Sequence, residues 1–261
     1  MFVDCHTHLE QHSRDELPAI LDRALQVGVS AIIIAGTTVE SSRQAVLLAH
    51  QYHALLAGVG VHPMDLNGHL SQTDLDTLND LAGDPMTVVM SEIGLDHMRG
   101  APDHQIQEDA FRSQINIALE RHLPIIYHTR EATAYTLRLL KEEKAFVVGG
   151  AAHYFQGDWH NACQVLDMGF YISLAKPLLR LPDLQEVAKR LPLDRIVLET
   201  DAYPQMFKRH RKTWTEPRDI RLVAAKLADL HQVDIDDIER RTTANVRKML
   251  GEQADRLPHD I

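Results

Sequence analysis

Short apolar runs alternate with amphipathic stretches along the whole chain. The runs are continuous rather than alternating and often β-branched, which is typical of parallel strands that are covered on both faces. They predict eight strands, at Phe2–Cys5, Ala31–Ala35, Leu56–Val61, Thr87–Glu92, Pro124–Tyr127, Phe146–Ala151, Phe170–Leu174 and Arg195–Thr200. Apolar residues recur at helical spacing between several of them, and these stripes predict helices around Leu17–Ala24, Ala45–Tyr52, Phe111–Leu119 and Ile220–Leu227.

Eight strands that alternate with helices predict an α/β fold, and a TIM (β/α)8 barrel is its leading form. An open doubly wound sheet is the alternative, but no glycine-rich phosphate loop follows an early strand. A last helix is expected to begin after its cap, Asp234, and to end near Leu250, before Gly251. The pattern therefore predicts one barrel domain over residues 1–261 with an extra C-terminal helix.

The composition is that of an ordinary globular protein, with 44% hydrophobic and 25% charged residues among 261. A net charge of −10 disfavours a protein that coats nucleic acid non-specifically, although it allows a local basic site. The two cysteines, Cys5 and Cys163, do not suggest a disulfide framework, and a reducing, cytoplasmic location fits them. No apolar run approaches the ~18 residues of a membrane span, and no leader pattern is recognisable, so no membrane association is expected.

Side chains that can bind metals follow the predicted strands. They are His6 and His8 after the first strand, His62 after the third, Glu92 at the end of the fourth, His128 after the fifth, His153 after the sixth and Asp201 after the eighth. In a barrel these strand ends converge on one face, where enzymes of this fold keep their sites. Each residue alone is more typical of a structural hydrogen bond or a helix cap. Together they would be costly to bury without cations, at about 1–3 kcal/mol for each unpaired polar group.

The spacing of the first pair adds to this interpretation. His6 and His8 are two residues apart at the tip of a strand, so their side chains point to the same side. Without His62, six of these seven residues are candidate metal ligands. Six ligands exceed the three or four that one zinc ion needs. Two divalent ions that share a carboxylate accommodate them, with Glu92 as the natural bridge. Imidazole ligands favour zinc or manganese over a pure magnesium site, and the choice among these metals stays open.

Other residues near this pattern have simpler expected roles. The remaining histidines are expected outside the site, and the loop residues His12 and His97 are the nearest to exceptions. Cys5 points away from His6 and is expected in the packing of the barrel. Asp4 has two open interpretations, as an acceptor that orients a ligand imidazole or as a structural hydrogen-bond acceptor.

Six blocks of sequence carry a resemblance to a known family. They read DCHTH (4–8), GVHP (60–63), SEIGLD (91–96), YHTRE (127–131), HYFQG (153–157) and LETDAYP (198–204). In order and spacing they resemble the TatD family of metal-dependent hydrolases, within the amidohydrolase-like superfamily. The glutamate of SEIGLD is informative because many amidohydrolases have a modified lysine in its place. The resemblance implies a two-metal TIM-barrel hydrolase, often a deoxyribonuclease.

The resemblance also implies roles for individual residues. It assigns one metal to His6, His8, Glu92 and Asp201, and the other to Glu92, His128 and His153. Asp201 would also handle the proton of the attacking water, so Asp201 and Glu92 are the catalytic candidates. His62 would line the phosphate pocket, and the family usually has an arginine at the position of Arg130.

Positively charged residues suggest where phosphate would bind. Arg130, beside His128, is the best single candidate, and Lys176, after the seventh strand, is another, with a surface lysine as the alternative. A basic segment follows the last strand, with Lys208, Arg209, Arg211, Lys212, Arg218 and Arg221 opposed only by Glu216 and Asp219. Loops after the last strands of a barrel commonly bind phosphate, but a solvated charged loop fits equally well. Trp214 in this segment either stacks on a base or packs the loop onto the barrel.

Two positions depart from the resemblance. Thr215-Glu216-Pro217 stands where relatives usually have Asn-x-Pro, and Ser91 replaces a usual glycine.

We expect a hydrolase that cleaves phosphodiester bonds of DNA, or of another phosphate-bearing substrate, through a water activated by two metals. The alternatives are ester or amide hydrolysis at the same site, such as deacylation of charged tRNA, and a non-catalytic partner subunit. The sequence leaves the substrate, the direction of digestion and the oligomeric state open.

Overall fold

A computed structural model of the chain describes residues 1–258, so residues 259–261 of the predicted domain lie outside the described part. Eight parallel strands form one sheet in the order in which they occur in the chain. They are β1 (Phe2–Thr7), β2 (Val29–Ala35), β3 (Leu55–Val59), β4 (Thr87–Asp96), β5 (Ile125–Arg130), β6 (Gly150–Ala152), β7 (Tyr171–Leu174) and β8 (Ile196–Leu198).

The sheet curls until β1 meets the segment that follows β8. Thr7 and Ala202 form a parallel bridge. The backbone N–H of Asp201 donates to the carbonyl of His6 at 3.0 Å, and the N–H of His8 donates to the carbonyl of Ala202 at 2.7 Å. The predicted TIM barrel is therefore confirmed, and the same bonds bring Asp201 next to the two histidines of β1.

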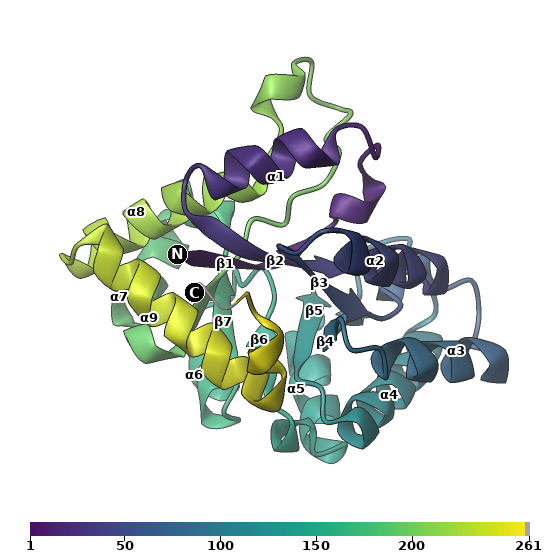
Figure 1. Cartoon of the computed structure of the whole chain (residues 1–261). Helices are drawn as coiled ribbons and strands as arrows, with labels where there is room; N and C mark the ends of the chain where they lie inside the picture. Colours follow the sequence, from purple (N-terminus) through teal and green to yellow (C-terminus); the bar gives the residue numbers. More distant parts are fainter. Residues whose placement is uncertain (259–261) are drawn as a thin grey trace.

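Helices surround this barrel (Figure 1). They are α1 (Leu17–Leu25), α2 (Val39–Gln51), α3 (Gln72–Ala82), α4 (His104–Arg121), α5 (Thr133–Glu142), α6 (Trp159–Asp167), α7 (Pro182–Arg190), α8 (Ile220–His231) and α9 (Ile235–Leu250). Several begin at a side-chain cap, such as Thr38 before α2 and Asp158 before α6. The predicted apolar stripes face the sheet, because Leu17, Ile20 and Ala24 are all buried. Within residues 1–258, no helix combines the length and the apolar character needed to cross a membrane.

The last helix, α9, closes the amino-terminal end of the barrel. Its residues Val246, Met249 and Leu250 pack in one cluster with side chains from inside the barrel, including Cys5, which is fully buried as expected. Asn245 donates from Nδ2 to the carbonyl of Leu193 at 2.8 Å and to that of Ile196 at 2.7 Å. The extra C-terminal helix is therefore confirmed, and it leaves the opposite end of the barrel open for a site.

The predicted sixth strand, Phe146–Ala151, is wrong in its position. Ala145–Val147 form a 3-10 turn, in which Phe146 and Val147 are 48% and 67% exposed, and the strand occupies Gly150–Ala152. Glycine explains the shift. Gly150 has φ +136°, and a Cβ there would lie 1.8 Å from the carbonyl oxygen of Ile125, so only glycine allows β6 to approach β5.

Two strands continue further than their apolar runs. β1 extends to Thr7 and β4 to Asp96, so His6 and Glu92 lie within strands and not at their ends. β4 extends because its polar half still pairs with β5, as far as Asp96 opposite Arg130. Gly94 makes this close pairing possible, since a Cβ there would lie 2.0 Å from the carbonyl oxygen of His128.

Candidate metal centre

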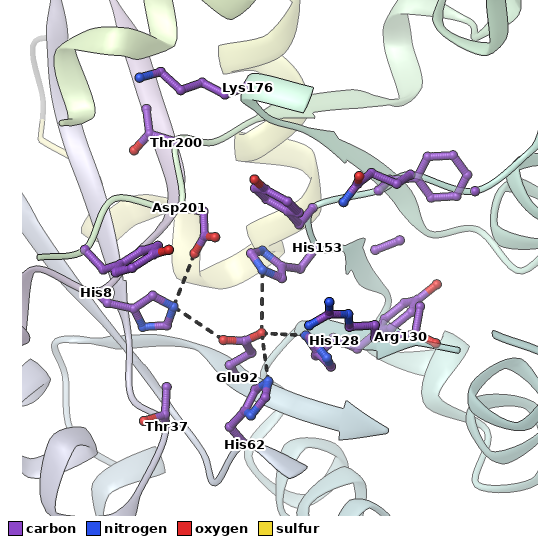
Figure 2. Close-up of a pocket in the computed structure, with 18 of the residues that line it drawn as sticks. His8, Thr37, His62, Glu92, His128, Arg130, His153, Lys176, Thr200 and Asp201 are labelled. Carbon is purple, nitrogen blue, oxygen red and sulfur yellow. Dashed lines mark ion pairs between the residues drawn. The ribbon is translucent and has the colours of Figure 1, made fainter. Parts of the chain in front are cut away.

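Glu92 lies at the centre of a ring of imidazoles at the carboxyl end of the barrel (Figure 2). The ring consists of His6, His8, His62, His128 and His153. Glu92 Oε1 lies 3.0 Å from His128 Nδ1 and 3.5 Å from Nε2 of both His62 and His153. Glu92 Oε2 lies 3.4 Å from Nε2 of both His6 and His8. We call these residues together with Asp201 the Glu92 cluster.

Asp201 joins the cluster from the segment after β8. Its Oδ1 lies 3.3 Å from His8 Nε2, and its side chain is 20% exposed. The backbone of Asp201 has φ +51°, a region that is costly for residues other than glycine. The hydrogen bond to the His6 carbonyl holds it there. His6 and His8 point to the same side as expected, with their Nε2 atoms 3.3 Å apart.

The second nitrogen of several imidazoles faces an oxygen acceptor behind the ring. His8 Nδ1 donates to the carbonyl of Ala35 at 3.0 Å. His128 Nε2 donates to Asp96 Oδ2 at 3.0 Å, and His153 Nδ1 lies 3.0 Å from Glu199 Oε1. Such acceptors hold the proton on the rear nitrogen and leave the lone pair of the other nitrogen free for a metal. Hydrogen bonds therefore orient His8 and His128 with one nitrogen toward the centre of the ring, and the ion pair with Glu199 does so for His153.

Sequence reasoning did not assign Asp96 and Glu199. Both stand in recognised blocks, SEIGLD and LETDAYP, so the blocks were the available signal. Glu199 is fully buried and is held by the backbone N–H of Tyr154 at 2.7 Å and by Ser173 Oγ at 2.5 Å. A carboxylate fixed in this way fixes the imidazole in front of it.

His62 differs from the other imidazoles in its hydrogen bonding. Its Nδ1 accepts the backbone N–H of Met64 at 3.1 Å. A neutral His62 must then carry its proton on Nε2, the nitrogen that faces Glu92 and the cavity. His62 is consequently arranged as a hydrogen-bond donor, which agrees with its predicted place in a phosphate pocket.

Further buried polar residues lie around the cluster. Asp4 accepts from the backbone N–H of Thr200 at 2.9 Å and from its hydroxyl at 2.5 Å, so it is the structural acceptor of its two interpretations. Glu10 was not identified from the sequence, which contains no signal for it. Its Oε1 lies 3.9 Å from His8 Nδ1, and burial raises the pKa of this carboxyl to about 7.

His12 and His97, the two loop histidines whose place outside the site was least certain from the sequence, lie outside the Glu92 cluster. His12 is buried, with Nδ1 3.5 Å from Glu16 Oε2. His97 stacks on His104 with ring centroids 3.7 Å apart. Neither belongs to the groups of side chains that are close enough together to hold an ion.

Electrostatics within the cluster favour ionised carboxylates beside protonated His8 and His153, whereas burial lowers the pKa of His62 to about 4 and leaves that ring neutral. Burial alone would raise the pKa of Glu92, but the surrounding imidazoles, His62 and His153 foremost, and hydrogen bonds from other rings hold it well below its usual range. Burial would lower the pKa of His8, but Asp201 and Glu92 raise it well above its usual value. Burial would likewise lower the pKa of His153, but the carboxylates of Glu199 and Glu92 raise it to about 9. Protons therefore occupy the positions that cations would take.

Three sets of ligand atoms lie within 4.8 Å of one another. They are His6, His8 and Glu92; His6, His153 and Asp201; and His62, Glu92 and His128. All six predicted metal ligands occur in these sets. His153 groups with His6 and Asp201, and its ring centroid is 6.4 Å from that of His128. Imidazole nitrogens with carboxylate oxygens suit a divalent ion such as zinc or manganese. The division of the ligands between two ions stays a prediction.

The proton occupancy predicts how metal binding depends on pH. The pKa of His153 is about 9 in the folded protein, against an ordinary value of 6.5. The protonated ring therefore stabilises the metal-free protein fully below pH 6.5, and this stabilisation is lost as the pH rises through about 9. A metal must displace this proton. We expect the rise in Tm on adding Mn²⁺ to grow across this window, measured by thermal unfolding. His160→Gln, an exposed histidine outside the cluster, should behave like the wild type, and a pH-independent rise would contradict this account.

A cavity of about 990 Å³ opens in front of the cluster, at the upper end of the range of about 300–1,000 Å³ for ligand pockets. His62, Arg130 and Lys176, the predicted phosphate-binding residues, all line it. Arg130 is exposed beside His128 (Figure 2). The Lys176 ammonium lies 2.6 Å from Asp219 Oδ2 and 3.2 Å from Thr215 Oγ1, so its charge is already paired.

The six cations of the basic segment after β8 do not line the cavity. Arg211 binds Glu16 at 2.7 Å and Glu216 at 2.9 Å, and Arg218 lies 3.2 Å from Glu216. Trp214 packs against Arg211, whose guanidinium lies 4.5 Å from the ring centroid. Much of the segment's charge therefore holds the loop onto the barrel. Of the two interpretations of Trp214, stacking on a base or packing the loop onto the barrel, the structure favours packing.

A TIM barrel with an imidazole and carboxylate cluster at its carboxyl end defines a protein with a candidate metal centre. The chain belongs to the family described as TatD related DNase, whose family model matches residues 3–251, and the resemblance is confirmed. It is 32% identical over 255 residues to "Uncharacterized metal-dependent hydrolase YabD" of Bacillus subtilis, covering 95% of this chain and 98% of that one. It is 32% identical over 240 residues to "3'-5' ssDNA/RNA exonuclease TatD" of Citrobacter koseri, covering 89% and 92%. The crystal structure of YjjV, a TatD homolog from Escherichia coli, superposes with a TM-score of 0.86 at 28% identity and covers 95% of this chain and 97% of that one.

Proposed function

We propose that this protein is a metal-dependent hydrolase that cleaves phosphodiester bonds of nucleic acid, with DNA as the first candidate substrate. The observation that carries the proposal is the ring of imidazoles around Glu92 at the floor of a cavity whose wall presents Arg130. Membership of the TatD family and a relative named as an exonuclease support it. The two free thiols are compatible with action in the cytoplasm.

We further propose that the cluster holds two divalent ions, of zinc, manganese or magnesium, with Glu92 as the shared ligand. His6, His8 and Asp201 would complete one ligand set, and His128 and His153 the other. When bound, the ions would supply positive charge that polarises the phosphodiester and lowers the pKa of water toward about 7.

The chain's own groups divide the remaining tasks. Arg130 has the planar guanidinium that binds phosphate oxygens in pairs, and Nε2 of His62 donates a further hydrogen bond. Lys176 uses two of its three N–H groups on Asp219 and Thr215, which leaves one for a phosphate oxygen. The carboxylate of Asp201, which is partly exposed to the cavity, accepts the proton of the attacking water.

The test compares metal-free and metal-loaded protein on defined oligonucleotides. After chelation, the protein is reloaded with Mn²⁺, Zn²⁺ or Mg²⁺ separately and given end-labelled single-stranded or double-stranded DNA. We expect nucleotides with phosphate termini to be released only by reloaded protein. Intact oligonucleotides with every metal would refute the proposal. Release of a free carboxylic acid from charged tRNA, with its phosphodiester bonds intact, would move the chemistry to a carbon centre.

A further inference from the structure

The loop after β8 displays two apolar side chains outside the cavity. Met206 and Phe207 are 79% and 74% exposed, more than any other large apolar residue in the described part of the chain. They stand at the start of residues 206–213, which we call the projecting loop. Figure 1 shows this loop, in light green, extending beyond α1 at the edge of the molecule. A pair of adjacent exposed apolar residues on a projecting loop is typical of a contact surface.

Hydrogen bonds within the projecting loop give it a defined shape. The backbone N–H of Lys208 donates to the carbonyl of Gln205 at 2.8 Å, and the N–H of Thr213 donates to the carbonyl of His210 at 2.9 Å. The ammonium of Lys208 donates across the loop to the carbonyl of Thr213 at 3.1 Å. Arg211 anchors the loop to the barrel through Glu16 and Glu216. Met206 and Phe207 are therefore held outward by a formed loop.

The cations of the projecting loop fall into two groups. Arg211 is neutralised by carboxylates, as described above. Arg209 and Lys212 are exposed, and within residues 1–258 neither has a carboxylate partner. Burial and the charge of Lys176 lower the pKa of Lys208, whose ammonium donates to the carbonyl of Thr213 at 3.1 Å. The loop thus presents positive charge beside its apolar pair.

The base of the projecting loop belongs to the cavity itself. Tyr203, Gln205 and Thr215 flank the loop on both sides and line the same cavity as Glu92 and Asp201. The backbone N–H of Thr215 donates to Gln205 Oε1 at 2.8 Å, which ties the two flanks together. A polymer that leaves the cavity on the side of Tyr203, Gln205 and Thr215 therefore passes the loop.

We propose that the projecting loop binds the single-stranded part of a nucleic acid substrate as it leaves the cavity, with unpaired bases on Phe207 and Met206 and phosphates on Lys208, Arg209 and Lys212. The inference rests on the proposed function and adds how the substrate is recognised. Aromatic and apolar side chains accept any base on their faces, and unpaired cations follow the backbone, which is the chemistry of sequence-tolerant single-strand binding. An anionic membrane would also match the loop, but continuity with the cavity favours a substrate strand.

Binding of a cleavage-resistant strand tests this proposal directly. The metal-loaded, full-length protein is titrated into a fluorescent phosphorothioate single strand, and Kd is measured by anisotropy. Met206→Ser/Phe207→Ser is expected to raise Kd by about fivefold or more, because a stacked base contributes at least that much. Arg209→Gln/Lys212→Gln is expected to raise Kd and to lower the slope of log Kd against log salt by about 0.7 for each cation removed.

Matched variants at the opposite end of the barrel provide the controls. Phe146→Ser removes an exposed phenylalanine from the turn before β6, and Lys141→Gln removes an exposed cation from the end of α5. Both should bind the strand like the wild type. Equal Kd values for the loop variants and the wild type would overturn the proposal. A second outcome would overturn the proposal in favour of a membrane: the wild type binds vesicles of phosphatidylglycerol, while Met206→Ser/Phe207→Ser does not bind them but still binds the strand like the wild type.

Turnover separates this proposal from the proposed function. Hydrolysis of bis(p-nitrophenyl) phosphate, which is too small to reach the projecting loop from the cavity, reports on the metal centre alone. We expect kcat/KM for a long single strand to fall relative to that for the small diester in both loop variants. A wild type that hydrolyses neither substrate refutes the proposed function, while the anisotropy result still decides whether the loop binds the strand.

Discussion

Glu92→Gln is expected to abolish phosphodiester hydrolysis and to remove most of the divalent metal from the purified protein. The substitution keeps the shape of the side chain but removes the negative charge that five imidazoles surround. A neutral amide is a poor ligand for a shared site, so kcat/KM should fall on the order of 10³-fold or more. Metal content by mass spectrometry and turnover on an end-labelled oligonucleotide measure the two losses together.

The fold should survive this change. In the metal-free wild type, His8 and His153 hold protons because Glu92 and its neighbours raise their pKa values. Without the charge of Glu92 these rings can release their protons, so no uncompensated charge has to remain buried. Circular dichroism should show native helix content. Glu120→Gln, an exposed glutamate on α4, is the matched control, and full metal content with full activity in Glu92→Gln would contradict the assignment of this residue.

Asp201→Asn is expected to separate catalysis from metal binding. Its carboxylate is partly exposed to the cavity, and although burial would raise its pKa, His8 and the neighbouring rings lower it, so the group is ionised at neutral pH. Losing this proton acceptor should lower kcat by about 10²–10⁴-fold. The amide oxygen can still face His8, and the other candidate ligands are untouched, so bound metal should stay closer to the wild-type level than in Glu92→Gln.

Steady-state kinetics and metal analysis on the same preparation decide this prediction. KM should change less than kcat, because Arg130 and His62 would still hold the phosphate. Asp65→Asn alters another carboxylate on the cavity wall and should leave kcat unchanged. If metal and activity disappear in equal proportion in Asp201→Asn, then its role as a ligand explains the whole loss, and its further role as the proton acceptor is refuted.

Much of the site could be predicted because its residues follow a local rule. Parallel strands align their carboxyl ends, so polar residues after successive apolar runs had to meet on one rim. His6 and His8 share a side because strand side chains alternate. The sixth strand was misplaced because Phe146 and Val147 are apolar and β-prone, yet the conformations that Gly149 and Gly150 adopt start the strand later. The β-propensity of single residues does not show that β6 must approach β5 closely at Gly150.

By itself, the sequence determined the barrel, its extra C-terminal helix and the set of imidazoles and carboxylates at one end, because each depends on periodicity within a strand or helix. The tertiary structure alone decided which nitrogen of each imidazole faces the centre, since His153 is paired with Glu199 and His128 with Asp96. It also decided the roles of the basic segment. Arg211 is neutralised by Glu16, which lies 195 residues away in the chain, while Met206 and Phe207 stay exposed. Such contacts join distant parts of the chain, and no local pattern encodes them.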